Sequence, residues 1–342
     1  MGAASGAARR HRTRSAKCGW TLPAGSARGL RRPTSSTRAS LPSGIRRRSA
    51  ARARRPSTRG ARETDRLLPA ALHAVRALEH RDLPVLAGAP PRARDGPQRG
   101  ARVKQIACCQ PHYIPWIGYF EMIDRVDEFW FLDDVDFIKR EWKNRNRIRK
   151  DRTGAEVKWL TVPIERASQR GTHIAAAKLA SDVDWRRRHL DAFRHVYRHA
   201  PFFADALELL EAGFARTAAT LGDLNVALLI DLCRYLGIET ALGCTSSLGA
   251  SGHKTEKLIG VCRAVGATGY LANNGSAGYL RLECFADERI ACAFQDYEHP
   301  TYEQRSQGAL LPFVSHLSVL DLIANQGADS LELLRQGGRV RS

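Results

Sequence analysis

The sequence predicts an α/β protein with a mostly parallel, Rossmann-like sheet, a helical insertion in its middle and a disordered basic tail at its N-terminus. Three observations lead to this prediction. Short apolar segments alternate with helical ones at both ends of residues 103–338, as in parallel sheets with crossover helices. Between them, at about 184–236, only helical patterns occur. Residues 1–102 show neither the helical period nor strand alternation.

The tail of residues 1–102 carries the whole excess of positive charge. Of the 54 Lys and Arg and the 35 Asp and Glu in the chain, 24 and 5 lie in this tail, which therefore has a charge of +19. The rest of the chain holds 30 of each sign and is neutral. A segment with so few large apolar side chains cannot offset the entropy cost of folding. We therefore expect one folded domain over residues 103–338.

Three explanations of the tail remain open. The first is a translation of GC-rich DNA ahead of the true start codon. The second is a basic arm that binds nucleic acid or acidic lipid. The third is a transit segment, because such segments are poor in acids and no Asp or Glu precedes Glu63. Nucleic acid is not an expected partner of the folded domain. No apolar run approaches the roughly 18 residues that a membrane span needs. We expect a cytoplasmic protein.

Local patterns predict the order of elements in the domain. Residues 129–132 are apolar throughout, which favours a strand covered on both faces. Cys108 and Cys109 would point to opposite faces of their strand, and no cysteine pair has the spacing of a zinc or redox site. Asp184 is a predicted helix cap. The predicted strands are 105–109, 129–132, 158–164, 240–243, 269–272 and 290–294, and the predicted helices are 119–125, 185–199, 201–215, 225–236, 254–265 and 318–334.

Residues that follow the predicted strands are the candidate ligand site, because parallel sheets bind ligands beyond the carboxyl ends of their strands. The loop after the first strand combines two prolines, a glycine that permits close backbone approach and aromatic rings that can stack on a ligand. Its candidate binding residues are His112, Tyr113, Trp116, Gly118 and Tyr119.

Asp133 and Asp134 follow the second strand directly. Two carboxylates there could hold Mg²⁺ or an amino group, or act as a general base; alternatively, they only begin a turn. The next segment, 139–152, contains eight Lys or Arg and two acids. These basic side chains could neutralise the two aspartates and bind phosphate or carboxylate. Alternatively, the segment is an ordinary solvated surface. Its candidate binding residues are Lys139, Trp142, Asn144, Arg145, Asn146 and Arg147.

Further candidates lie near the C-terminus. Lys254 opens a helix after a glycine turn, which suits either a phosphate cradle or plain capping, and the spacing is not that of a P-loop. His299 follows the last predicted strand and is the preferred acid or base, unless it is structural. Tyr302 is its neighbour. Asp321 and Asn325 share a helix face, where they could line the site or cap the helix.

A series of short motifs in this chain resembles the WbqC-like protein family, and the resemblance covers nearly all of residues 103–338. The motifs are Gln110-Pro111-x-Tyr113-x-Pro115-Trp116-x-Gly118-Tyr119-Phe120, Leu132-Asp133-Asp134-Val135, Trp142-x-Asn144-Arg145-Asn146-Arg147-Ile148, Trp159-Leu160-Thr161-Val162-Pro163, Tyr297-Glu298-His299-Pro300-x-Tyr302-x-Gln304, Ser318-x-x-Asp321-Leu322 and Asn325-x-Gly327.

The resemblance implies a role in the biosynthesis of O-antigen or other surface polysaccharides or of glycosides, because members of the family occur in gene clusters for surface polysaccharides. A glycine-transferring role has been suggested for one branch of the family. We therefore expect a transferase that adds an acyl or aminoacyl group to an amino sugar. The basic segment would grip the phosphates of a nucleotide sugar or another small phosphorylated ligand, and Asp133, Asp134 or His299 would deprotonate the acceptor amine. The alternatives are a non-catalytic binding protein of the same pathway and a nucleic-acid binder acting through the tail.

Overall fold

A six-stranded sheet forms the centre of the computed structural model, which describes residues 103–181 and 183–341. The predicted tail, 1–102, lies outside the described residues. All neighbouring strands are parallel except the edge strand β10, which is antiparallel to β7. The predicted mostly parallel α/β architecture is therefore confirmed. The strands in spatial order are β10 (Val340–Arg341), β7 (Ala291–Gln295), β6 (Gly269–Asn273), β1 (Gln105–Cys109), β2 (Glu128–Phe131) and β5 (Ala241–Cys244).

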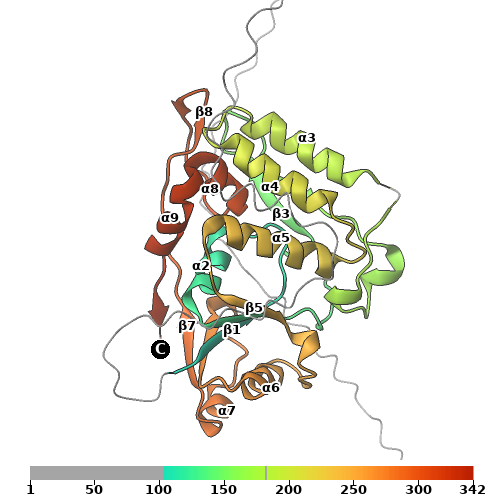
Figure 1. Ribbon diagram of the computed structural model, residues 1–342, viewed down its shortest axis with the longest axis vertical. Coiled ribbons are helices and arrows are strands. Elements are labelled where there is room, and N and C mark those ends of the chain that lie inside the picture. The colour runs from blue at the N-terminus through green and yellow to red at the C-terminus, as the bar shows by residue number, and fades with distance from the viewer. Residues whose placement is uncertain (1–102, 182, 342) are drawn as a thin grey trace, which may run out of the picture. The chain divides into compact units, whose positions relative to one another are not determined.

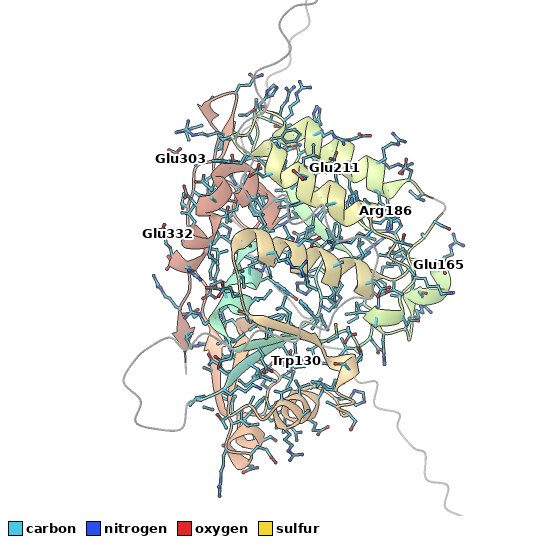
Figure 2. The ribbon with its side chains drawn as sticks, viewed as in Figure 1. Trp130, Glu165, Arg186, Glu211, Glu303 and Glu332 are labelled. Atoms are coloured by element: carbon cyan, nitrogen blue, oxygen red, sulfur yellow. The ribbon has the colours of Figure 1, made fainter. Side chains whose placement is uncertain are left out.

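Helices cover both faces of this sheet (Figure 1). Helices α2 (Ile117–Arg125) and α5 (Leu221–Leu236) lie on one face, and α6 (Thr255–Val265) and α7 (Leu282–Asp287) lie on the other. Alternate strand residues therefore enter different cores. Cys108 packs with the α6 side and Cys109 with the α2 side, as predicted. Phe129 is buried on the α2 side, whereas Trp130, labelled in Figure 2, packs on the α6 side.

The predicted helical insertion lies between β2 and β5. It contains α3 (Trp185–Tyr197), α4 (Phe203–Ala215) and α5, preceded by the short 3₁₀ turns η2 (Arg166–Gln169) and η3 (Ile174–Ala176). Asp184 caps α3 as predicted, because its side chain accepts a hydrogen bond from the backbone N–H of Arg187 at 3.3 Å. Helix α5 begins four residues earlier than predicted, at a capping box formed by Thr220 and Asp223.

Two expectations about the elements need correction. The strand predicted at 158–164 forms as β4 (Val157–Thr161), but it pairs antiparallel with β3 (Arg145–Arg149) in a hairpin outside the parallel sheet. The helix predicted at 318–334 is divided into α8 (Val319–Gln326), the 3₁₀ turn η6 (Gly327–Asp329) and α9 (Ser330–Gln336). Gly327 has a φ of +54°, and a Cβ on it would lie 2.5 Å from the ring of Phe202, so the chain turns there.

Two short elements complete the described chain, a hairpin of β8 (Arg305–Ser306) and β9 (Ala309–Leu310). Across the residues that the structure describes, no helix combines the length and apolar character that a membrane crossing requires.

Candidate functional site

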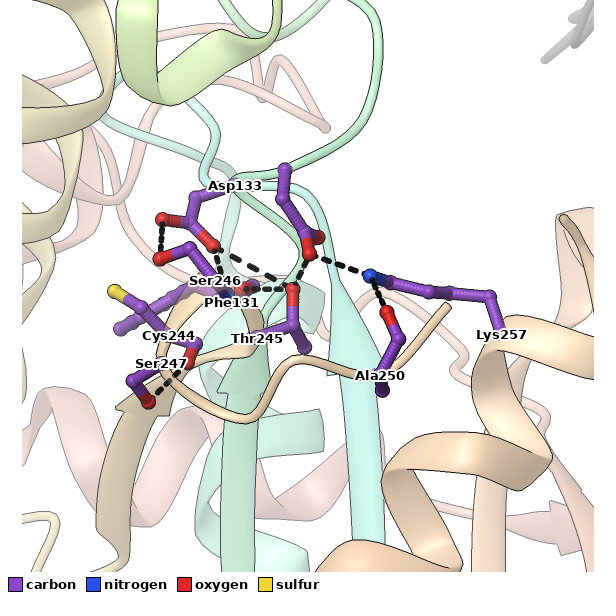
Figure 3. Close-up of polar contacts among 9 residues, drawn as sticks. Phe131, Asp133, Cys244, Thr245, Ser246, Ser247, Ala250 and Lys257 are labelled. Atoms are coloured by element: carbon purple, nitrogen blue, oxygen red, sulfur yellow. Dashed lines mark hydrogen bonds and ion pairs between the residues drawn. The ribbon is translucent and has the colours of Figure 1, made fainter. Parts of the chain in front are cut away.

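Asp133 and Asp134 follow β2 at the carboxyl edge of the sheet, where their side chains bond to the 3₁₀ turn η4 (Thr245–Ser247), which follows β5, and to α6 (Figure 3). Asp133 accepts hydrogen bonds from the backbone N–H of Ser246 at 3.0 Å and from its hydroxyl at 2.6 Å. Asp134 accepts a bond from the Thr245 hydroxyl at 2.6 Å and forms an ion pair with Lys257. The counter-charge of the aspartates is therefore supplied by α6, not by the basic segment 139–152.

This carboxylate cluster ties the two strand ends to α6. Thr245 is fully buried and Asp133 is 5 % exposed, so their hydrogen bonds are shielded from water. Ser246 is exposed and was not a sequence candidate; the available signal was a Thr-Ser-Ser run that begins two residues after the predicted strand 240–243. Among residues 103–181 and 183–341, no group of three or more His, Cys, Asp or Glu is placed to hold a metal ion.

The loop after β1 is held from behind by two buried asparagines. Asn146 of β3 donates to the backbone carbonyl of Ile114 at 2.9 Å and to that of Tyr113 at 3.2 Å. Asn225 of α5 donates to the carbonyl of Pro111 at 2.8 Å. Ile114 has a φ of +37°, which is strained for a β-branched residue, so the loop needs these bonds to keep its shape.

Three other candidates of this loop are largely internal. The Tyr119 hydroxyl donates to the Gln110 carbonyl at 2.9 Å, and the Tyr113 hydroxyl bonds to Nδ1 of His189 at 2.8 Å. The His112 ring lies 5.1 Å from the Tyr119 ring. Burial, aided by the nearby Lys143 charge, lowers the pKa of His112 to about 3, so its imidazole is neutral.

One face of the β3–β4 hairpin presents arginines against tryptophans. The guanidinium carbon of Arg145 lies 4.2 Å from the centre of the Trp159 ring. That of Arg147 lies 5.5 Å from Trp142 and 5.8 Å from Trp159. Within the described residues neither arginine forms an ion pair, and the buried Nε atom of each has no hydrogen-bond partner. Stacking thus holds two positive charges in place without a neutralising carboxylate.

His299 lies beside this hairpin in a stack of rings. Its ring centre is 5.0 Å from His316 and 6.1 Å from Trp116, and Arg147 donates to the His316 carbonyl at 3.0 Å. Burial lowers the pKa of His299 to about 4, so the ring is neutral. Its Nδ1 is 2.8 Å from the Pro300 carbonyl and must donate to it. The buried Nε2 therefore keeps a lone pair, which has no hydrogen-bond partner among residues 103–181 and 183–341.

Asp321 and Tyr302 belong to a buried network rather than to an open site. Asp321 is fully buried and accepts bonds from Tyr302, Tyr197 and Gln304 at 2.7–2.8 Å. Asn325 donates to the Asp321 carbonyl at 2.7 Å. Burial raises the pKa of Asp321.

The remaining candidates have separate positions. The Gly118 carbonyl accepts a bond from Gln295 at 2.8 Å, and a Cβ on Gly118 would lie 2.4 Å from the Trp116 ring. Lys139 is exposed and donates to Gln169 at 3.0 Å. Lys254 is exposed at the start of α6 with a φ of +52°, and its side chain caps nothing. Asn144 is buried and donates to the Val162 carbonyl at 3.0 Å.

The structure therefore brings one group of candidates together and leaves others apart. Trp142, Arg145 and Arg147 lie together at the hairpin, and His316, whose carbonyl accepts a bond from Arg147, connects them to the rings of Trp116 and His299. The hydrogen bonds of the Asp133 and Asp134 side chains run to η4 and α6 instead.

Comparison with known proteins agrees with these motifs. The model of the WbqC-like protein family matches residues 110–333. Uncharacterized protein Rv1507c of Mycobacterium tuberculosis is 34 % identical to this chain over 235 residues, which are 68 % of this chain and 98 % of that protein. The chain matches no solved structure at a significant level. The family match spans every candidate residue described above, and this chain belongs to the WbqC-like protein family.

Proposed function

We propose that this chain is a transferase that adds an acyl or aminoacyl group to an amino sugar in polysaccharide or glycoside biosynthesis. The family name points toward polysaccharide biosynthesis. The observation that carries the proposal is the pair of arginines on the hairpin. Arg145 and Arg147 stack on tryptophans and form no ion pair among the described residues. Two fixed guanidinium groups suit the diphosphate of a nucleotide sugar, because arginine binds phosphate oxygens in pairs.

His299 is the base in this proposal. Its ring is neutral and its Nε2 lone pair is unengaged within the described residues, and His316 connects the ring to Arg147 of the arginine pair. The acceptor amine attacks the acyl carbon of an activated ester or thioester donor. His299 Nε2 takes the proton that the amine loses, and this proton then leaves with the alcohol or thiol of the donor. The new bond is an amide.

Binding is tested first, by thermal shift of the full chain with UDP-, dTDP- and GDP-sugars. We expect stabilisation by at least one sugar nucleotide, and its loss in the double variant Arg145→Gln, Arg147→Gln. The exposed Arg263→Gln serves as a control because it also removes one positive charge. The basic tail is present in all three proteins, so its contribution to nucleotide binding cancels. Equal responses of the wild type and the double variant to every sugar nucleotide would refute the anion site.

Transfer is tested with the nucleotide sugar that binds. The nucleotide-linked amino sugar is incubated with the protein and with aminoacyl and acyl thioester donors, and the mass of the product is measured. We expect His299→Gln to keep the thermal shift and to lose transfer. Undiminished transfer by this variant would exclude His299 as the base.

A second candidate is a non-catalytic protein that binds the same ligand. It is favoured by the hydrogen bonds of Asp133 and Asp134, which are engaged by Ser246, Thr245 and Lys257 as in a structural cluster. The transferase and the binding protein are distinguished by whether the bound sugar nucleotide is converted to product. A sugar nucleotide that stabilises the chain but is recovered unchanged with every donor supports binding alone.

A further inference from the structure

A groove between strand β4 and helix α3 lies next to the arginine hairpin. It encloses about 620 Å³ and is lined by Lys158, Trp159 and Thr161 on the β4 side and by Trp185, Arg188 and His195 on the α3 side, among others. None of these six residues was a sequence candidate. Trp159 belongs to both regions, because Arg145 stacks on its ring and the residue, which is 40 % exposed, also lines the groove.

The groove has an excess of positive charge. Lys158 and Arg188 stand on its two sides, and neither forms an ion pair within the described part of the chain. Asp191 also lines the groove, but it already lies 3.5 Å from the guanidinium groups of Arg187 and Arg194. An anionic group between Lys158 and Arg188 would therefore meet two available cations.

Trp185 gives the groove an unsatisfied donor. The residue is 2 % exposed, it lines the groove, and its buried indole N–H has no acceptor among the described residues. Arg186, labelled in Figure 2, lies 4.5 Å from the Trp185 ring centre and has no acceptor to offer. A buried donor without an acceptor is costly, and the hydroxyl oxygen of a ligand would satisfy it.

We propose that this groove binds an anionic saccharide, as the acceptor subsite of the transferase. The sugar ring stacks on the exposed indole of Trp159, a hydroxyl oxygen accepts the indole N–H of Trp185, and a phosphate or carboxylate lies between Lys158 and Arg188. The assignment as the acceptor subsite rests on the proposed function, whereas the binding itself does not. Trp159 then separates the sugar from the anion site at Arg145 and Arg147.

The test is isothermal titration of the full chain with N-acetylglucosamine 1-phosphate, glucuronic acid, neutral N-acetylglucosamine and inorganic phosphate. We expect an anionic sugar to bind at least tenfold more tightly than the neutral sugar or phosphate alone. The sugar phosphate and the uronic acid distinguish phosphate from carboxylate as the anion. No binding of either anionic sugar, or equal binding of inorganic phosphate, overturns the proposal.

Variants on one helix supply matched controls. Arg188→Gln, at an exposed position in the groove, should weaken binding about tenfold, as expected for the loss of one charge-assisted hydrogen bond. Its neighbour Arg187→Gln, which is exposed and pairs with Asp184, should stay within about twofold of the wild type. Trp185→Phe keeps a ring but removes the N–H, and should also weaken sugar binding. Wild-type affinity in both Arg188→Gln and Trp185→Phe overturns the proposal.

The two proposals fail separately. Arg145→Gln with Arg147→Gln should abolish the nucleotide-sugar shift and leave sugar-phosphate binding in the groove intact. Arg188→Gln should weaken sugar-phosphate binding in the groove and leave the nucleotide-sugar shift intact. If the groove binds no anionic saccharide while sugar nucleotides still stabilise the chain, the subsite is wrong and the proposed function stands. If the groove binds and no transfer occurs with any donor, the groove is a binding site without the proposed reaction.

Discussion

The Arg147 guanidinium group donates a hydrogen bond to the backbone carbonyl of His316 at 3.0 Å, across 169 residues of sequence. His316 in turn stacks on Trp116 at a ring distance of 5.0 Å and on His299 at the same distance. One side chain therefore links the hairpin that carries the anion site to the ring stack that carries the candidate base. This link is the reason why the two parts of the proposed site share one location.

The ion pair of Lys257 with Asp134 should contribute to stability, because both side chains are largely buried. We expect Lys257→Met to lower the free energy of unfolding by about 2–3 kcal/mol, since Asp134 keeps its charge without its partner. The exposed Lys254→Met should change it by less than about 0.5 kcal/mol. Urea denaturation of the three proteins measures both values. Equal unfolding free energies of the wild type and Lys257→Met would show that water solvates Asp134 as well as Lys257 does.

Asn146 should be needed to hold the strained loop after β1. Asn146→Ala removes the donor to the carbonyls of Tyr113 and Ile114 and should cost about 2–3 kcal/mol of unfolding free energy, since both acceptors stay buried. Asn274→Ala, at an exposed position, is the control. Chemical denaturation measures the difference. A loss no larger than that of the control would mean that the loop keeps its φ of +37° at Ile114 without this side chain.

Buried neutral histidines should make the protein less stable in mild acid. The pKa of His112 is lowered to about 3 in the folded chain and is about 6.5 in the unfolded chain. Between these values the unfolded chain binds a proton that the folded chain does not, so the free energy of unfolding falls as the pH falls. His189 and His299, with pKa values of about 4, act in the same direction.

A variant isolates the contribution of His112. Between pH 7.5 and pH 5.0, His112→Asn should lose about 2 kcal/mol less unfolding free energy than the wild type. The exposed His253→Asn should follow the wild-type curve. Urea titrations at several pH values give these curves. Parallel curves for wild type and His112→Asn would contradict the neutral buried imidazole.

Two tyrosines allow a charged and a neutral hydrogen bond to be compared. Tyr302 donates to the buried Asp321 carboxylate at 2.8 Å, whereas Tyr297 donates to the Leu334 carbonyl at 2.9 Å. Tyr302→Phe should cost about 2 kcal/mol and Tyr297→Phe about 1 kcal/mol, because bonds to charged groups are stronger. Guanidinium denaturation measures both. A larger loss for Tyr297→Phe would mean that the hydrogen bond from Tyr302 to Asp321 contributes less stability than the neutral bond from Tyr297.

Local patterns in the sequence were enough to predict the sheet and its layers. The apolar residues 129–132 marked β2 (128–131), a strand with a hydrophobic cluster packed on each face, and Asp184 marked the start of α3. These predictions succeeded because burial on both faces and helix capping depend on neighbours within a few residues. The family could also be recognised in this way, from short motifs that the family model matches over residues 110–333.

Tertiary structure alone decided which charged side chains meet. The pairing of Asp134 with Lys257, the bond from Arg147 to His316 and the groove at Arg188 each join segments far apart in sequence. The sequence of segment 139–152 predicted a solvated surface or an anion site. It did not predict strand β3 within that segment, because arginine is rarely buried. Arg149 nevertheless lies inside, 1 % exposed, with acceptors at Gln304 and Pro312. The sequence by itself determined the five parallel strands of the central sheet, the cap of α3 and the family. The fold determined the site, because partners that are tens of residues to more than a hundred residues apart leave no local period to detect.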